Sequence, residues 1–523
     1  TSALDVDTKG SKTVAVGRDA LGTQNFTSAT DTFNTAVGFK AGFSITTGTH
    51  NTLIGAQAAG DMTDADYNTA VGFNAMTTNQ LGSRSVAIGY EALKTQNPSS
   101  AADMYNVGIG FNAGQQITTG DRNVAVGSTA LDACTTGQYN TAVGNDALTS
   151  LTTAANITAV GISAGAAITT GASNTAIGAR ALAATTTGAN NTATGFEALK
   201  ANTTGASNCA FGYISLVGNT TGVNNTSMGF YSLVSNTTGT DNNGFGYGTL
   251  LNCTTGYNNV ALGGGASYLA SSLNALTTGY RNVGCGVGAG AAITTGSNNV
   301  AVGDAALYNC TTEGQNIAVG GSSLSACVTG YNNVAVGHVA GSSVTTGHNN
   351  IFIGRDAGIT GSPGGNITSQ SNYVVLGDEN IAYIRTAVGV TANSDQRDKT
   401  DFTALDLGLD FVKALAPVTY KWDKRSKYGD KTADGYDLND QTPDGTHKED
   451  WLDIGFKAQE VEALEQAAGY NKNNKTNLLA SITPDGKSYG LTYEKFIPIL
   501  VKAIQEQNAL IEALTARVAT LEG

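Results

Sequence analysis

Hydrophobic and polar residues alternate along most of this chain in a unit of about 17 residues. A glycine closes each short apolar run, as at residues 34–38, and such glycines occur 20 times from Gly17 to Gly354. Sixteen of the nineteen spacings between them are 17 residues, and the other three are 21, 21 and 23. A fixed period of this size predicts stacked units that contact only their neighbours, rather than one globular core.

Residue size also alternates within each run. Counting back from the glycine, position −1 is usually large and apolar, as in Val37, and position −2 is small, as in Ala36. Position −4 is Asn in 17 of the 20 units. A Thr-Thr-Gly turn often precedes the run, and an Ala-Leu or Ala-Gly pair follows it. Each unit is therefore predicted to be a short strand, a turn, a second short extended segment and another turn, which makes one rung of a β-solenoid.

Side chains of a strand point alternately to two faces, so positions −1 and −3 share one face and positions −2 and −4 share the other. A 17-residue turn has a thin interior, which we expect the bulky residues at −1 to fill. The alanine stripe at −2 then needs another surface, and its burial against copies of itself predicts an obligate oligomer. The Asn residues suit a ladder between rungs, with a glycan-binding role for single Asn residues as the alternative. Twenty rungs would form a rod of roughly 95 Å.

The runs NTAVG, NVAVG and NTAIG, each followed by xxAL or xxAG, resemble the head repeat of YadA-type trimeric adhesins over about 340 residues. The resemblance implies a trimeric left-handed parallel β-roll of about 20 rungs at residues 11–360, after a lead-in at residues 1–10. Bacterial adhesins and phage fibres both use this roll, so the resemblance does not identify a ligand. Because the chain begins at Thr1 without Met, we expect a longer natural chain.

Charge density marks a boundary near residue 390. Residues 1–393 hold 12 Lys and Arg and 19 Asp and Glu, whereas the 130 residues from 394 onward hold 16 and 22. The net charge of −13 and the absence of a basic block argue against nucleic-acid binding. No apolar stretch approaches the ~18 residues of a membrane span, so no membrane insertion is expected.

The six cysteines follow the repeat. Four of them stand seven residues after a repeat glycine, namely Cys134, Cys253, Cys310 and Cys327. This position predicts small buried side chains rather than disulfides or metal ligands, and no CxxC pair occurs. We therefore expect folding in a reducing compartment, with no metal and no cofactor.

Beyond the repeats, the pattern predicts a neck at residues 361–393 with closing strands at 373–377 and 383–385. A helix at 405–415, a strand at 417–422, a polar loop at 424–450 and a helix opening at 455–461 follow. The last helix, at 493–521, carries a narrow apolar seam in which Ile or Val at a alternates mainly with Leu at d, typical of a coiled coil. The alternative is a helix that packs on its own domain. The seam residues are Ile497, Leu500, Ile504, Gln507, Ile511, Leu514, Val518 and Leu521.

Four segments in residues 394–523 resemble, in order, the intramolecular chaperone domain of phage tail spikes and fibres, which is also classed as an auto-processing serine peptidase of the endosialidase type. They are SDQRDK, GLDFVKALAPVTYKW, GFKAQEV and TYEKFIPILVKAIQE. The resemblance implies a small α+β domain that trimerises the fibre and then cuts itself off directly before the Ser of SDxRxK. Ser394 and Lys399 occupy the matching positions, which puts the cleavage site at Asn393–Ser394.

The chemistry of this pair can be argued separately. A serine hydroxyl needs a base to remove its proton, and a lysine is such a base only when burial or nearby positive charge lowers its pKa. Ser394 would attack the carbonyl carbon of Asn393, and water would resolve the product. Alternatively, Ser394 and Asp395 form a helix cap, and the basic residues of the motif pair with its acids. No oxyanion donor can be named.

These features predict a homotrimeric phage tail fibre that folds in the host cytoplasm, attaches to other virion tail proteins through its N-terminal end and contacts a host receptor, either a glycan or an outer-membrane component. A bacterial trimeric adhesin would need a secretion signal and a membrane anchor. A polysaccharide-degrading tail spike would need paired carboxylates in a groove. Acids are sparse in residues 1–393 and hold no recurring position. No activity on an external substrate is therefore expected, and self-cleavage remains the one candidate reaction.

Overall fold

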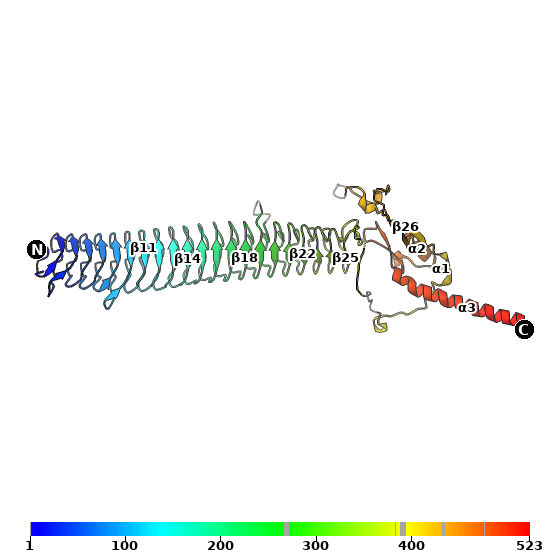
Figure 1. Ribbon diagram of the computed structural model, residues 1–523, viewed down its shortest axis with the longest axis horizontal. Coiled ribbons are helices and arrows are strands. Elements are labelled where there is room, and N and C mark those ends of the chain that lie inside the picture. The colour runs from blue at the N-terminus through cyan, green and yellow to red at the C-terminus, as the bar shows by residue number, and fades with distance from the viewer. Residues whose placement is uncertain (1, 266–270, 382, 388–393, 431–434, 475) are drawn as a thin grey trace. The chain divides into compact units, whose positions relative to one another are not determined.

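The computed structural model describes residues 2–265, 271–381, 383–387, 394–430, 435–474 and 476–523. The chain divides into two compact units, Thr1–Asn316 and Ile317–Gly523. The first unit is a β-solenoid whose turns stack side by side (Figure 1). The second unit carries four further strands of the same kind and a small region of helices and short hairpins.

The predicted period is confirmed in the first unit, where each turn contributes one three-residue strand. Neighbouring strands pair in parallel with equivalent residues opposite each other, so Thr141 lies beside Thr158 and Ala142 beside Ala159. The strands are β2 (Val14–Val16), β4 (Thr35–Val37), β5 (Thr52–Ile54), β6 (Thr69–Val71), β8 (Val86–Ile88), β10 (Val107–Ile109), β11 (Val124–Val126), β12 (Thr141–Val143), β13 (Thr158–Val160), β14 (Thr175–Ile177), β15 (Thr192–Thr194), β16 (Cys209–Phe211), β17 (Thr226–Met228), β18 (Asn243–Phe245), β19 (Val260–Leu262), β20 (Val283–Cys285) and β21 (Val300–Val302).

The interior of the solenoid reverses the predicted orientation of the strand. In β14, Ala176 and the preceding Asn174 are fully buried, whereas Ile177 is 41% exposed. The expectation that the large residues at −1 fill the interior and leave the alanines exposed is therefore wrong. The interior is already occupied by the Ala-Leu pair of the same turn, Ala181 and Leu182, which leaves room for only a small side chain at −2.

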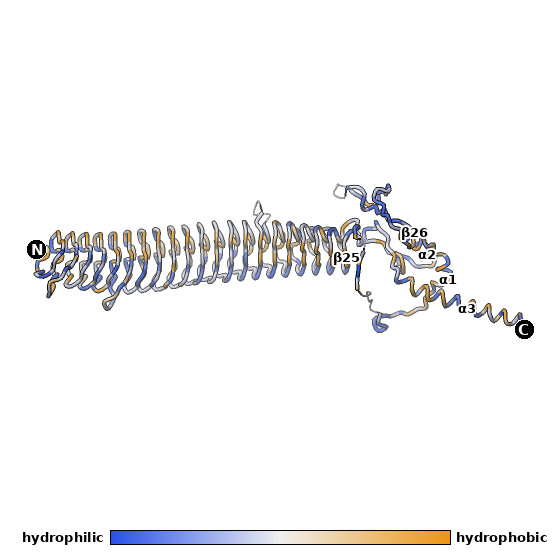
Figure 2. The backbone as a smooth tube through the Cα atoms, in the orientation of Figure 1, coloured by the Kyte–Doolittle hydropathy of each residue, from blue (hydrophilic) through white to orange (hydrophobic). Residues whose placement is uncertain are grey.

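The second segment of each turn is hydrogen-bonded between rungs but is not extended, contrary to the prediction. Positive φ angles recur at alternate residues, with +131° at Gly178, +58° at Arg180 and +53° at Leu182. The Arg180 N–H donates to Ile162 O of the turn before (2.9 Å), and the Leu182 N–H donates to Ala198 O of the turn after (3.1 Å). This conformation lets the neighbouring residues Ala181 and Leu182 both face the interior, which an extended strand would prevent. Figure 2 shows the hydrophobic segments of successive turns in line along the solenoid.

The Asn residues at −4 form the predicted ladder through the interior. The Asn225 backbone N–H donates to Asn208 Oδ1 (3.0 Å), and Asn225 Oδ1 accepts from the Asn242 N–H (3.0 Å). The Asn225 side-chain amide also donates to Gly239 O in the next Thr-Thr-Gly turn (2.8 Å). Each buried Asn therefore satisfies backbone groups of neighbouring rungs, which a buried polar group requires.

The glycine that closes each run allows the rungs to approach closely. Gly144 has a φ of +136°, and a Cβ atom there would lie 2.5 Å from Gly161 O of the next rung. Both the backbone angle and the contact therefore require glycine at this position.

Two of the longer repeat units carry additional short strands. A 21-residue unit holds β3 (Thr30–Asp31), which pairs in parallel with β1 (Gly10–Ser11). The second 21-residue unit holds β9 (Ala102–Asp103), which pairs in parallel with β7 (Gly82–Ser83). Each insertion thus stays hydrogen-bonded to the preceding turn, and the ladder of longer strands continues beside it.

In the second unit, the ladder consists of β22 (Ile317–Val319), β23 (Val334–Val336), β24 (Ile351–Ile353) and β25 (Val374–Leu376), again parallel and in register. The first predicted closing strand is thus one more rung, with Val375 buried at position −2. The prediction of a second closing strand is wrong, because residues 383–385 form no strand. Those residues are exposed and lack the ladder contacts that hold β25.

The C-terminal region packs around one small core, formed by Leu407, Phe411, Val461, Leu479, Phe496 and Ile499. Glu465 of α2 is buried, and its carboxylate accepts backbone N–H bonds from Leu478, Leu479 and Ala480. The elements are η2 (Gln396–Asp398), α1 (Leu409–Ala414), β26 (Val418–Tyr420), η3 (Arg425–Lys427), η4 (Leu438–Asp440), β27 (Asp453–Gly455), α2 (Ala458–Ala467), η5 (Lys472–Asn474), β28 (Ala480–Ile482), β29 (Tyr489–Leu491), η6 (Tyr493–Lys495) and α3 (Phe496–Glu522).

The predicted helices and the strand at 417–422 are present in this region, with bounds that differ by a few residues. The helix expected from Gly455 begins at Ala458, because Gly455 belongs to β27, which pairs antiparallel with β26. The antiparallel hairpin of β28 and β29 was not predicted. Its sequence signal is Asp485-Gly486, a dipeptide typical of tight turns, between two short apolar runs.

Candidate functional site

The predicted serine and lysine lie on either side of the short helix η2, at the start of the C-terminal region. Asp395 caps this helix by accepting the backbone N–H of Arg397 (2.9 Å). The Lys399 backbone N–H in turn donates to Gln396 O (3.2 Å) and closes the turn. One helical turn therefore separates Ser394 from Lys399, which places their side chains on the same side of the loop.

The structure brings the two side chains into contact. Lys399 Nζ lies 2.5 Å from Ser394 Oγ and 3.5 Å from the Ser394 carbonyl oxygen. The first distance is suitable for proton transfer between the hydroxyl and the amine. Asn393, the other residue of the predicted cleavage site, lies outside the described residues.

The other charged residues of the motif pair with each other. Arg397 Nη2 lies 2.6 Å from Asp395 Oδ2. This side-chain bond, together with the backbone N–H of Arg397, lowers the pKa of Asp395, and the same contact raises the pKa of Arg397. The alternative reading of the motif is therefore realised for Asp395 and Arg397, while Lys399 bonds to the serine.

The site is open to solvent in the single chain. Every residue from 394 to 404 is exposed. A lysine needs burial or nearby positive charge to become a neutral base at neutral pH. The contact geometry for serine–lysine chemistry is thus present, but the residues described around it do not bury the pair.

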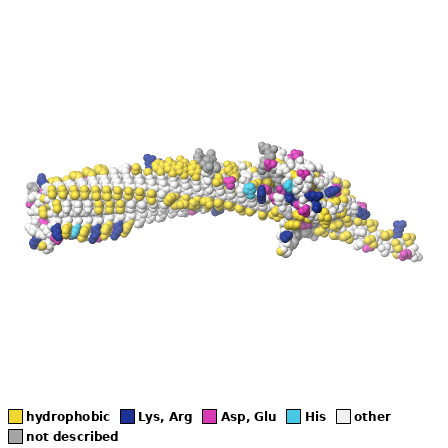
Figure 3. Space-filling model, turned by 45° about the horizontal axis from the view of Figure 1, so that its top comes forward, with side chains coloured by type: hydrophobic (Ala, Val, Ile, Leu, Met, Phe, Trp, Pro, Cys, Tyr) yellow, Lys and Arg dark blue, Asp and Glu magenta, His cyan; other side chains and the backbone are white. Residues whose placement is uncertain are grey.

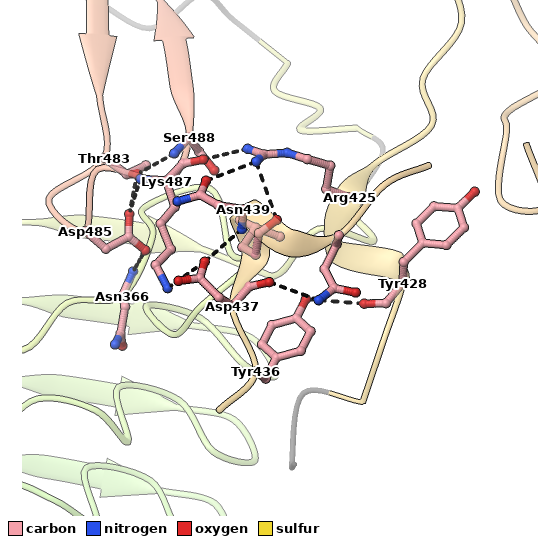
Figure 4. Close-up of polar contacts among 12 residues, drawn as sticks. Asn366, Arg425, Tyr428, Tyr436, Asp437, Asn439, Thr483, Asp485, Lys487 and Ser488 are labelled. Carbon is pink, nitrogen blue, oxygen red and sulfur yellow. Dashed lines mark hydrogen bonds and ion pairs between the residues drawn. The ribbon is translucent and has the colours of Figure 1, made fainter. Parts of the chain in front are cut away.

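A second polar cluster anchors the long loop that follows β26. Arg425 donates to Lys487 O (2.6 Å) and to Asn439 Oδ1 (3.2 Å), and Lys487 Nζ lies 3.1 Å from Asp437 Oδ1 (Figure 4). The Asn439 backbone N–H and the Lys487 ammonium lower the pKa of Asp437. The loop at 424–450 is therefore tied to the β28–β29 hairpin rather than detached, and sequence analysis missed this cluster.

The hairpin turn contributes a further carboxylate to the same cluster. Asp485 accepts bonds from the Thr483 hydroxyl (2.5 Å), the Lys487 N–H (3.1 Å) and the Asn366 N–H (3.1 Å). Burial alone would raise the pKa of Asp485, but these hydrogen bonds outweigh it and lower the pKa. These Thr483, Asp485 and Lys487 groups pair with one another, which indicates a structural role for the cluster.

Two of the other candidate groups are buried thiols. Burial raises the pKa of Cys134 to about 11 and that of Cys253 to about 12, which keeps these thiols protonated and unreactive. In the described part of the chain, no group of three or more His, Cys, Asp or Glu residues could hold a metal ion. No helix among the same residues is long and apolar enough to cross a membrane.

Comparison with known proteins finds a family match for the segment that contains this serine–lysine pair. Residues 394–470 match the peptidase S74 family, described as chaperone of endosialidase. The match begins at Ser394 and contains Lys399, α1, the β26–β27 hairpin and α2. No curated protein matches the chain. A domain of this family after a parallel β-solenoid of about 20 turns fits a tail fibre or tail spike with a C-terminal chaperone domain.

Proposed function

We propose that the chain is the subunit of a homotrimeric virion tail fibre that adheres to the host surface. In this proposal the solenoid of residues 11–360 is the fibre shaft, and residues 394–523 are an intramolecular chaperone that brings three chains together. The neck at 361–393 joins the two, and the chaperone cuts itself off between Asn393 and Ser394. The resemblance of the repeats to trimeric adhesin heads and the chaperone match support this proposal.

The observation that carries the proposal is an exposed apolar belt on the solenoid. We use this name for the outward positions −3, −1 and +1 of successive turns, where large apolar side chains form lines along the stacked turns (Figure 3). Exposed apolar surface on this scale marks an interaction site. In the first unit the exposed side chains of the belt include Val16, Phe39, Ile54, Phe73, Ile88, Tyr90, Ile109, Phe111, Val160, Ile162, Ile177, Phe196, Phe211, Met228, Phe230 and Leu262.

The belt fits copies of the same chain, because every copy presents the same line of side chains with the same spacing between rungs. A closed ring of three identical chains would bury all three belts around one axis. The strands of the second unit continue the pattern with exposed Val336, Ile353 and Leu376. This arrangement replaces the alanine stripe as the predicted subunit contact, while the predicted oligomer is retained.

The terminal helix α3 provides a second surface for trimerisation. Its seam residues are exposed in the single chain, with Ile504 at 60% and Leu514 at 63%. A helix of 27 residues with so much apolar surface on one stripe is suited to a coiled coil of three such helices. The coiled coil would align the chains at one end before the solenoid winds.

Self-cleavage would follow trimerisation. Ser394 Oγ attacks the carbonyl carbon of Asn393, Lys399 takes the hydroxyl proton and passes it to the departing Ser394 amine, and water hydrolyses the resulting ester. Because the pair is exposed in one chain, a neighbouring chain would have to bury Lys399 before its amine could act as a base. Cleavage would then occur only in assembled fibres.

The intact mass of the chain under denaturing conditions tests cleavage. We expect wild type to split into fragments 1–393 and 394–523, and Ser394→Ala and Lys399→Ala to remain whole. Lys413→Ala, which removes an exposed lysine of the same domain, is the matched control and should split like wild type. A wild-type chain that stays whole in assembled fibres would make the domain a permanent trimerisation cap.

Host adhesion rests on the architecture rather than on a defined ligand site. A long fibre with neither metal site nor reactive cluster among its described solenoid residues favours binding over catalysis. We propose a surface glycan or outer-membrane component as the receptor and other tail proteins as partners at the N-terminal end. Release of sugar from host polysaccharide by the purified fibre would instead indicate a degrading tail spike.

A further inference from the structure

One column of aromatic and basic side chains stands apart from the uniform repeats. At position −5, eight consecutive turns of the first unit carry Lys12, Phe33, His50, Tyr67, Arg84, Tyr105, Arg122 and Tyr139. The next turns carry Asn or Ser at this position, such as Asn156 and Ser173. The column is half exposed, with Tyr67 at 50%. Figure 3 shows basic side chains and a histidine in one line near the N-terminal end.

The side chains of this column, which we call the margin column, contact one another from rung to rung. The rings of His50 and Tyr67 stack with their centres 4.7 Å apart, and the Arg84 guanidinium lies 5.0 Å from the centre of the Tyr67 ring. Arg122 lies 5.4 Å from the Tyr139 ring. Because the faces of the rings are occupied by neighbours, the column presents ring edges and basic groups to a partner.

The two 21-residue insertions support the margin column. The strand β3 supplies Asp31 to Lys12 (2.8 Å), and β9 supplies Asp103 to Arg84 (2.9 Å). Each insertion therefore holds a basic side chain of the previous turn in place. The insertions and the column occur in the same part of the solenoid, which indicates one local device rather than two unrelated irregularities.

The opposite edge of the apolar belt carries a second column, at position +1. Position −5 precedes the strand, and position +1, the last position of the belt, follows its glycine. The two columns therefore lie on the two sides of belt positions −3 and −1. In the eight turns of the margin column, position +1 is aromatic in four, with Phe39, Phe73, Tyr90 and Phe111. The other four turns carry Arg18, Ala56, Ser128 and Asn145 there. Phe73, Tyr90 and Phe111 stack on one another, with ring centres 5.6 and 5.2 Å apart.

We propose that in the trimer the margin column of one chain packs against the +1 column of the next chain, rung by rung. This inference rests on the proposed trimer and identifies its subunit seam. When three belts face a common axis, the leading edge of each chain meets the trailing edge of its neighbour, which is the head-to-tail contact of a ring. Aromatic edges and guanidinium groups on one side complement aromatic rings on the other.

The seam gives the trimer a unique alignment. A slip of one rung would leave most belt contacts satisfied, since the belt repeats every turn. The margin column starts at Lys12 and ends at Tyr139, and its two insertions occur at fixed turns. Slipped chains would therefore place insertions and column ends against the wrong rungs, which penalises incorrect registers.

Cysteine cross-linking tests the seam in the full-length Ser394→Ala chain, in which we expect no self-cleavage. The two partly exposed native thiols are first removed by Cys209→Thr and Cys285→Val, so that only the introduced cysteines can link chains at the belt. Tyr67→Cys combined with Phe73→Cys places one thiol on each edge of the same turn. After oxidation we expect a covalent three-chain species on non-reducing denaturing gels that reverts with reductant. Tyr105→Cys with Phe111→Cys is a second pair, which keeps the test valid if the first variant folds poorly.

The controls separate the seam from the trimer itself. Each single cysteine variant, and Tyr67→Cys with Asn145→Cys four rungs away (roughly 19 Å along the axis), should give no three-chain species. Native mass measured on the same samples reports assembly. Trimers without cross-links, in which the cysteine at 67 stays open to a maleimide label, would overturn the seam and leave the proposed function standing. A single-chain native mass would overturn both.

Discussion

At the residue scale, the Asn ladder is the feature that the sequence predicted most directly. Asn at −4 in most turns is visible without a structure, and its amide has the donors and acceptor that a ladder needs. The alternation of residues along the strand does not predict which of its two faces lies inside. Alternation separates the positions into two sets, but the choice between them depends on what the second segment of the turn contributes. Ala181 and Leu182 fill that space through positive φ angles that no sequence period indicates.

The ladder makes a stability prediction. Asn225→Ala removes the acceptor of the Asn242 N–H and the donor to Gly239 O, both inside the solenoid. An unpaired buried polar group costs about 1–3 kcal/mol, so we expect a clearly lower melting temperature for the variant. Thermal unfolding followed by circular dichroism measures the change.

The matched control for this variant is Thr221→Ala, in the Thr-Thr-Gly turn that precedes Asn225. The Thr221 side chain is exposed, and the backbone N–H of residue 221 can still donate to Thr237 O. Its free energy of unfolding should lie within about 0.5 kcal/mol of the wild-type value, as is usual for surface substitutions. Equal melting temperatures for the two variants would show that the ladder does not stabilise the stack.

At the element scale, periodic segments were predicted well and irregular ones poorly. The 17-residue period located the strands of the solenoid, and the seam at three- and four-residue spacing located α3 within a few residues. The Arg425–Lys487 contact joins segments far apart in the sequence, and the β28–β29 hairpin is too short to show a period, so periodicity indicated neither of them. The cleavage site stays a prediction, because Asn393 lies outside the described residues.

In the proposed function, assembly of the trimer begins at the terminal helix α3. Ile504→Asp places a charge at the centre of the proposed coiled-coil seam, where burial of an unpaired carboxylate is costly. We expect this variant to yield no trimer and unfolded or aggregated shaft. Gln505→Asp puts the same charge on the next residue, outside the seam, and should assemble like wild type.

Sedimentation of the two purified variants distinguishes these outcomes. Trimers of normal yield from Ile504→Asp would mean that α3 packs in some other way and that assembly starts elsewhere in the chain.

At the scale of the whole molecule, the two units have complementary weaknesses. A parallel solenoid with 17-residue turns exposes an apolar belt and has many nearly equivalent alignments with its copies. The C-terminal region has a small core and an exposed seam helix that a partner would complete. A chaperone that holds three chains at one end would align the solenoids and cover its own exposed helix seam. Once the three solenoids have wound together, the shaft would bury its belt and the chaperone could leave.

Native mass of the Ser394→Ala chain tests the central claim most directly, since the expected loss of cleavage keeps each subunit at its full 53.1 kDa. We predict one species of three chains that persists on dilution to nanomolar concentration, because the proposed trimer would bury the belt along the shaft. A folded single chain of 53.1 kDa at micromolar concentration would contradict the account. The apolar belt would then have to face something other than copies of this protein.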